Sequence, residues 1–166
     1  MKKQMNKFKT FIILLVSFIL QTTIFSKIDI FGANVNLLLP AIVAISQVLA
    51  SKTATYGALF VGLLEDFLFT NFIGVRALSY FLLGSFVASD SFRFGKSKVT
   101  GFILTIVASI FNFLLLSLIY YILTRQSGFF NYIPLPLVVE SLLNGLIYLI
   151  YILIVKKIMY IPTYRM

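Results

Sequence analysis

The stretch GLLEDFLFTNFIGVR, Gly62–Arg76, places two adjacent carboxylates, Glu65 and Asp66, inside a segment that is otherwise mostly apolar. An ionisable group at the centre of a membrane span costs about 2.5–3.5 kcal/mol on insertion scales, so such a group usually has a specific role. The break between Thr70 and Arg76 separates this apolar run from the next one. The stretch therefore predicts a tight antiparallel hairpin of two helices with acidic residues inside it.

The composition of the whole chain is that of a membrane protein. Of its 166 residues, 60% are hydrophobic and 11% are charged, and the mean hydropathy is +1.02. Soluble domains are only about half apolar, and a single membrane span takes about 20 residues. We therefore expect an all-α integral membrane protein, with residues 1–166 forming a single transmembrane domain.

Six apolar runs predict six transmembrane helices in one bundle. The second and fourth runs lie near the lower limit of about 17–25 residues for a span. Pro40 lies inside the second run and predicts a kink there. The runs cover residues 10–26, 35–50, 54–71, 75–90, 99–123 and 134–155.

The basic residues predict the orientation of this bundle. If the N-terminus is cytoplasmic, Lys27, Arg76 and Arg125 lie in outer segments and the rest of the 14 basic residues lie in inner ones. Short cytoplasmic loops carry the excess of Lys and Arg in membrane proteins. We therefore expect both termini in the cytoplasm.

Several classes of function are disfavoured by what the chain lacks. It contains no cysteine and no histidine, which removes thiol nucleophiles, imidazole bases and His- or Cys-based zinc sites. No phosphate-binding loop is present. The lysines form short clusters between apolar runs and do not alternate with stacking aromatics, which disfavours nucleic acid as a partner. We expect no enzyme activity, no metal and no cofactor.

Polar residues of several helices are predicted to meet in the outer half of the bundle. Asp66 is expected to point inward, because Gly62 lies one turn away on the same face. Arg76 can reach back across the hairpin toward Asp66 or Glu65. The full predicted cluster is Asp66, Glu65, Arg76, Glu140, Asn144, Gln21 and Asn36.

Three interpretations of this cluster remain open. One is a buried ion pair of Arg76 with Asp66, with amides that fix the helix register. The second is a docking surface for a transmembrane helix of another protein. The third is a pocket for a small ligand, an ion or a proton.

Small residues predict where helices pack closely, because they let two backbones approach each other in lipid. Pairs of them recur four residues apart. The residues predicted for helix packing are Ala58, Gly62, Gly74, Gly84, Ala88, Ser141 and Gly145.

Three segments together resemble a known family. They are LQTTIF (20–25), NVNLLLPAIVAI (34–45) and above all GALFVGLLEDFLFTNFIGVRALSYFLLGSF (57–86). In this order they resemble the bacterial rod shape-determining protein MreD family. The resemblance carries over Asp66 as the acidic residue of the third span and Gln21 and Asn36 as polar positions of the first two. Val35 and Asn36 stand where the family commonly has a Pro-Asp pair, so a role that needs a carboxylate at residue 36 is not implied.

The resemblance implies a function and a set of partners. It implies a non-enzymatic, multi-pass component of the bacterial cytoplasmic membrane within the rod-shape and cell-elongation complex, a scaffold that positions peptidoglycan synthesis partners. The implied partners are a membrane-anchored MreC-like protein and, indirectly, MreB, RodA and penicillin-binding protein 2. In fold the family also resembles the substrate-binding subunits of energy-coupling-factor vitamin transporters, which supplies an alternative function. The bulky first span, TFIILLVSFIL (10–20), lacks the small-residue docking face that such a subunit would need.

Overall fold

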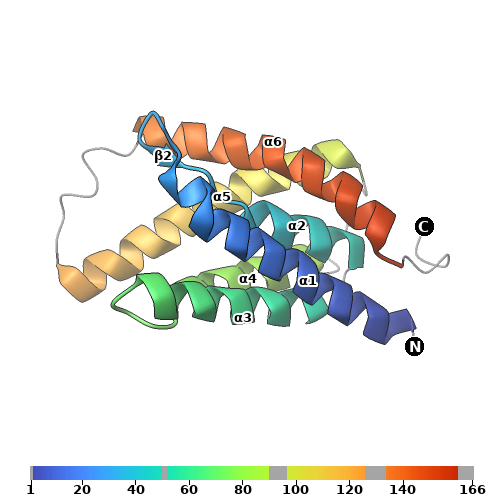
Figure 1. The fold of residues 1–166 in the computed structure, drawn as a ribbon. Coiled ribbons are helices and arrows are strands. Elements are labelled where there is room, and N and C mark those ends of the chain that lie inside the picture. Colours follow the sequence, from blue (N-terminus) through green and yellow to red (C-terminus); the bar gives the residue numbers. More distant parts are fainter. Residues whose placement is uncertain (1, 50–51, 90–96, 126–133, 161–166) are drawn as a thin grey trace.

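The protein is a bundle of helices in the computed structural model, which describes residues 2–49, 52–89, 97–125 and 134–160 (Figure 1). In these residues six α-helices confirm the predicted all-α bundle. A short 3₁₀ helix, η1 (Phe25–Lys27), and two strands, β1 (Asp29–Ile30) and β2 (Ala33–Asn34), lie between the first two helices. The α-helices are α1 (Lys2–Thr23), α2 (Leu38–Leu49), α3 (Lys52–Phe69), α4 (Val75–Ala88), α5 (Lys98–Thr124) and α6 (Pro134–Ile158).

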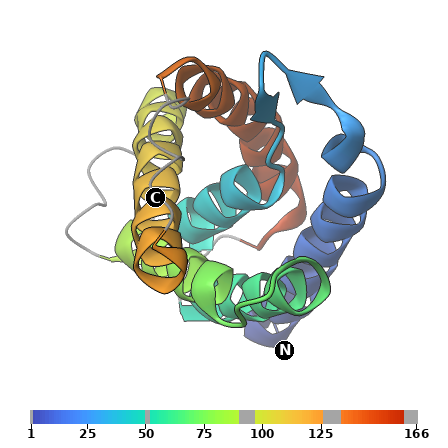
Figure 2. The same ribbon diagram turned by 90° about the vertical axis from the view of Figure 1, so that its left-hand side faces the viewer.

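Helix α2 forms the centre of the bundle. In the view down the bundle the other five helices surround it (Figure 2). Its buried side chains occur all around the helix, from Leu38 to Leu49, and an α-helix that is apolar on every side is one that other helices enclose. Helices α3 and α4 run antiparallel beside each other, as the hairpin prediction required.

Within the described residues three helical segments are long and apolar enough to cross a membrane: Gln4–Lys27, Lys98–Thr124 and Leu135–Ile158. The second and fourth predicted runs correspond to the shorter helices α2 and α4, and residues 50 and 90 of those runs lie outside the described residues. Helices α2 and α4 have 12 and 14 residues, so at 1.5 Å per residue they extend about 18 and 21 Å, less than the roughly 30 Å hydrocarbon core of a bilayer.

The predicted kink at Pro40 was wrong. Helix α2 begins at Leu38, so Pro40 lies in its first turn. The first four N–H groups of a helix have no acceptor within that helix, so a residue without an N–H is tolerated there. Asn36 marks the start of α2, since its side-chain oxygen accepts the N–H of Leu39 at 3.1 Å.

The β-hairpin before α2 was missed by the sequence prediction. Asp29 pairs with Asn34 and Ile30 with Ala33. The turn residues Phe31 and Gly32 both have positive φ angles, 55° and 80°, as in the tight turns that suit hairpins. Figure 2 shows the hairpin between the ends of α1 and α6. We call this end of the bundle the outer end.

The opposite end, which we call the inner end, is where α1 begins and α6 ends. The Asn6 side chain donates to the Tyr160 carbonyl at 2.8 Å and accepts the Tyr160 N–H at 3.0 Å. The Lys9 ammonium donates to the Ile158 carbonyl at 2.7 Å. The two helices therefore share one end of the bundle, as the predicted orientation with both termini on the same side requires.

Candidate functional site

Asp66 holds the start of α4 in place. Its carboxylate accepts the backbone N–H groups of Gly74 (2.9 Å), Arg76 (3.2 Å) and Ala77 (3.1 Å), and its side chain is fully buried. These donors are among those that a helix start leaves without an intrahelical acceptor. A carboxylate also interacts favourably with the positive end of the helix dipole. Asp66 therefore points inward, as expected, and closes the hairpin of α3 and α4.

The ion pair of Arg76 is formed with Glu65, one of the two acids that the sequence allowed it to reach, so the interpretation that pairs Arg76 with Asp66 was wrong. One guanidinium nitrogen of Arg76 lies 3.3 Å from the Glu65 carboxylate. Asp66 is already engaged by backbone donors, and Glu65 points to the other side of α3 because successive residues of a helix diverge by about 100°. Glu65 also accepts the Tyr80 hydroxyl at 2.9 Å, and that hydroxyl in turn accepts the Asn36 amide at 3.4 Å.

Gly62 allows the two helices of the hairpin to approach closely. A Cβ atom on Gly62 would lie 2.5 Å from the Ala77 Cα atom. Gly84 and Ala58 meet further along the hairpin, at 3.5 Å between a Cβ on Gly84 and the Ala58 Cβ. Gly74, predicted as a packing residue, has a different role: a Cβ there would meet nothing within 4 Å, and its φ of 104° forms the turn.

The other predicted packing residues lie mainly on α6. A Cβ on Gly145 would meet the ring of Phe102 on α5 at 2.8 Å. Ser141 is buried and donates to the carbonyl of Val138 on its own helix, at 3.0 Å. Ala88 is partly buried at the end of α4. Gly101 of α5, which was not predicted, shows the same closeness, because a Cβ there would meet the Tyr148 ring of α6.

Gln21 fixes the segment that precedes α2. Its side-chain amide donates to the Val35 carbonyl at 2.8 Å and accepts the Leu37 N–H at 2.6 Å. These two hydrogen bonds connect the end of α1 to the segment before α2. They provide partners for the Val35 carbonyl and the Leu37 N–H, which lie outside the two strands. Gln21 and Asn36 therefore place the start of α2 beneath the outer end of the bundle.

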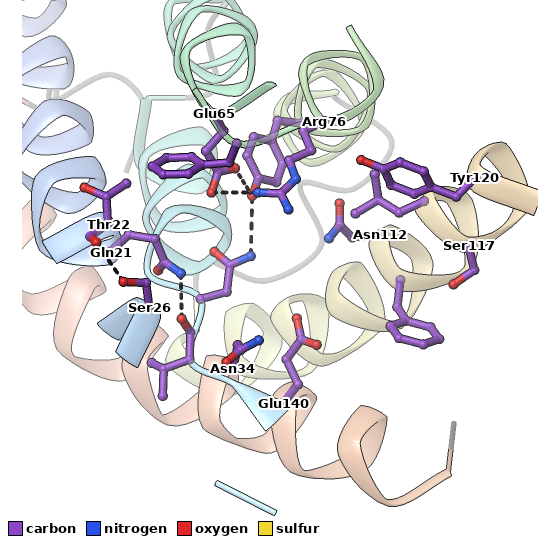
Figure 3. Close-up of a pocket in the computed structure, with 16 residues that line it drawn as sticks. Gln21, Thr22, Ser26, Asn34, Glu65, Arg76, Asn112, Ser117, Tyr120 and Glu140 are labelled. Carbon is purple, nitrogen blue, oxygen red and sulfur yellow. Dashed lines mark hydrogen bonds and ion pairs between the residues drawn. The ribbon is translucent and has the colours of Figure 1, made fainter. Parts of the chain in front are cut away.

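A polar cavity of about 370 Å³ opens above the start of α2 at the outer end (Figure 3). Glu65 and Arg76 lie on one side of it, and Glu140 of α6 projects into it from the opposite side. The α5 residues Asn112, Ser117 and Tyr120 form a third wall, and α1 and η1 contribute Gln21, Thr22 and Ser26. Five of the seven predicted cluster residues line this cavity, namely Glu65, Arg76, Glu140, Gln21 and Asn36.

The remaining two predicted residues lie behind the cavity wall. Asp66 faces the start of α4, as described above. Asn144 is fully buried one turn along α6 from Glu140, with which it interacts, and its amide donates to the Ser109 hydroxyl of α5 at 3.0 Å. Asn144 thus joins α5 to α6 and also forms a hydrogen bond with the Glu140 side chain.

Two features of the cavity distinguish it from a packed interior. Among the described residues no basic side chain forms an ion pair with Glu140, because the guanidinium opposite is paired with Glu65. Ser117 is buried, and its hydroxyl has no hydrogen-bond partner among the described residues. Buried polar groups in proteins nearly always have partners. The cavity thus has a carboxylate without a cation and a hydroxyl without a partner in the part of the chain that the structure describes.

Sequence reasoning missed the α5 wall of this cavity. Asn112 and Ser117 lie in the long apolar run of α5, and an isolated amide in such a run was a usable signal. The Asn112 side chain accepts the hydroxyl of Ser79 from α4, and both residues are buried. In the described residues no group of acidic, histidine or cysteine side chains could hold a metal ion.

Comparison with known proteins places the chain in one family. The model of the family described as rod shape-determining protein MreD matches residues 1–159. No curated protein and no solved structure matches the chain. The match covers nearly the whole chain, the helices that could cross a membrane agree with it, and the earlier resemblance is confirmed. The chain therefore belongs to the MreD family of rod shape-determining membrane proteins.

Proposed function

We propose that this protein is a non-enzymatic, multi-pass component of the bacterial cytoplasmic membrane that positions peptidoglycan synthesis proteins during rod-shaped growth. Membership of a rod shape-determining family supports the process. A scaffold role is supported by the chemistry of the site, since the chain has no histidine or cysteine and the cavity holds an ion pair and amides with no activated nucleophile.

The observation that carries the positioning role is the polar cavity at the outer end. Among the described residues Glu140 has no cation there and the Ser117 hydroxyl has no hydrogen-bond partner, while Arg76 is neutralised by Glu65. A carboxylate without a cation near the membrane is costly for the isolated protein. A partner that supplies a hydrogen-bond donor or a cation would remove that cost. We therefore propose that the cavity is a binding surface for a partner protein.

The partner that we propose is the membrane-anchored MreC-like protein that family membership implies, with MreB, RodA and penicillin-binding protein 2 recruited indirectly. A protein with one membrane span and a large extracytoplasmic domain would present its membrane-proximal chain at the level of this cavity. The contact surface then consists of Glu140, Asn112 and Ser117 on two helices, beside the Glu65–Arg76 pair.

Two experiments test the proposal. In the first, the protein is depleted in its host, and the rod-shaped cells should become spheres. In the second, the tagged protein is purified from undepleted cells and should co-purify with a single-span protein carrying a large extracytoplasmic domain. Rod shape that persists after clean deletion in a host without a paralogue would remove the proposal.

The substrate-binding subunit of an energy-coupling-factor transporter is the second candidate, and the cavity volume favours it. About 370 Å³ lies within the range of roughly 300–1,000 Å³ for small-molecule pockets. This candidate predicts that a vitamin raises the melting temperature of the purified protein and that ATPase subunits co-purify with it. The scaffold proposal predicts neither result.

A further inference from the structure

A cluster of lysines gathers at the inner end of the bundle, where α1 begins and α6 ends. The bonds from Asn6 and Lys9 to Tyr160 and Ile158 hold these two helix ends together. Lys9 is thereby brought against the last turn of α6, and Lys7 lies on the same turn of α1 as Lys9. We call Lys7, Lys9, Lys156 and Lys157 the inner lysine cluster.

Three members of this cluster have ammonium groups available to a partner. Lys7, Lys156 and Lys157 are exposed, and in the described residues none of them has a hydrogen bond or an ion pair. Lys9 differs, because it donates to the carbonyl of Ile158 and so satisfies an acceptor that the end of a helix leaves free.

No acidic side chain of the described chain is near enough to neutralise the cluster. Asp29 lies on the outer hairpin, and Glu65, Asp66 and Glu140 lie at or behind the outer cavity. The two ends of the molecule thus differ in charge, with the described carboxylates at one end and unpaired lysines at the other. The counter-ions of the cluster must come from outside the described chain.

Apolar side chains lie directly beside the cluster. Met5 and Phe8 are 49% and 66% exposed on the first turns of α1. Together with Gln4 and Lys9 they line a surface hollow of about 360 Å³. A ligand that combines negative charge with a hydrocarbon chain matches this end of the bundle, because the apolar hollow on α1 lies at the same end as the exposed lysines.

We propose that the inner lysine cluster binds the headgroup of an anionic phospholipid of the adjacent leaflet, with an acyl chain against Met5 and Phe8. Basic pockets between membrane helices bind such headgroups, and each basic residue near an anionic membrane surface strengthens the attraction about fivefold. A zwitterionic lipid carries its own ammonium group, which the lysines repel. The cluster therefore selects lipids by net charge.

A purely local explanation accounts for part of the cluster. Lysines in the last turn of α6 suit the negative end of its helix dipole, and Lys156 and Lys157 occupy that turn. Lys7 lies near the positive end of α1, where a helix favours acidic side chains. A bound anion would supply a counter-ion for all three lysines, including Lys7.

Native mass spectrometry of the purified full-length protein tests this proposal, with equimolar phosphatidylglycerol and phosphatidylcholine as the two lipids. The wild type should retain phosphatidylglycerol in preference. The triple variant Lys7→Gln, Lys156→Gln, Lys157→Gln should weaken its retention on the order of a hundredfold, from about fivefold per lysine. The variant with arginine at the same three positions should keep the preference.

A second variant removes basic charge from the outer end and serves as the control. Lys27→Gln, Arg125→Gln alters two exposed basic residues at that end and should keep the preference. Equal retention of both lipids by the wild type overturns the proposal, as does an unchanged preference in the first variant. Displacement of phosphatidylglycerol by millimolar inorganic phosphate also overturns it, because the site would then bind a free anion.

Discussion

Glu65 and Asp66 are consecutive residues of α3 whose carboxylates have different kinds of partner. Asp66 accepts three backbone N–H groups at the start of α4, at 2.9–3.2 Å. Glu65 pairs with the Arg76 side chain at 3.3 Å and accepts the Tyr80 hydroxyl at 2.9 Å. One carboxylate closes the helical hairpin, and the other forms part of the cavity wall.

Replacement of Asp66 should destabilise the fold strongly. Asp66→Leu leaves buried N–H groups without an acceptor, at about 1–3 kcal/mol for each group. Asp66→Asn keeps one acceptor oxygen but turns an NH₂ group toward the remaining donors, so its loss should be intermediate. Circular dichroism melts of the purified variants in detergent measure both.

Asp29 provides the matched control for this prediction. It too accepts a backbone N–H, from Gly32 at 2.6 Å, but it is exposed on the hairpin. Water can replace that bond, so Asp29→Asn should change the melting temperature little. Equal losses from Asp66→Asn and Asp29→Asn would contradict the role that we assign to Asp66.

The Glu65–Arg76 pair should show strong energetic coupling. The Glu65 side chain is 7% exposed, so removal of Arg76 leaves its charge buried without compensation, whereas Arg76 is 32% exposed and water can solvate it when Glu65 is removed. A double-mutant cycle of Glu65→Gln and Arg76→Gln should therefore give a coupling energy of about 1–3 kcal/mol. Additive losses in chemical unfolding would show that the pair contributes nothing.

Two glycines of α3 should respond in opposite ways to alanine. Gly62→Ala places a methyl group against the backbone of α4, 2.5 Å from the Ala77 Cα, and should cost about 1–3 kcal/mol. Gly57→Ala meets only the end of the flexible Leu14 side chain, which can move aside. Because alanine is the better helix former by about 1 kcal/mol, Gly57→Ala should be neutral or stabilising in the same thermal melts.

Glu140→Gln should separate stability from partner binding. It removes a carboxylate that has no cation among the described residues, so the isolated protein should become more stable by about 1 kcal/mol, or a few degrees in melting temperature. Co-purification of the single-span partner should fall at the same time. A loss of stability would indicate that Glu140 has a structural role instead.

The fold and the hairpin could be predicted because hydropathy and small residues act locally. The apolar runs gave the six helices, and Gly62 beside Asp66 indicated the inward face of α3. The bounds of α2 could not be predicted, because its start depends on Asn36 capping a backbone that the distant Gln21 holds. The apolar run alone does not show at which residue these hydrogen bonds make the helix begin.

The partners within the polar cluster could be predicted only in part. Sequence separation allowed Arg76 to reach either acid, and the choice of Glu65 follows from Asp66 being occupied by backbone donors, which is a three-dimensional fact. The cavity wall on α5 was missed because Asn112 and Ser117 are isolated within an apolar helix. Asn112 and Ser117 line the same cavity as Glu140 because α5 packs against α6.

The most direct test of the central claim is photo-crosslinking from the cavity in intact cells. Tyr120 lines the cavity, and its neighbour Tyr121 does not line it and is 45% exposed on α5. A photoreactive phenylalanine analogue replaces each tyrosine in turn, so the two variants differ only in the direction of the probe. We predict an adduct with the single-span partner from residue 120 and none from residue 121. An adduct from residue 121 alone would contradict the assignment of the outer cavity as the partner site.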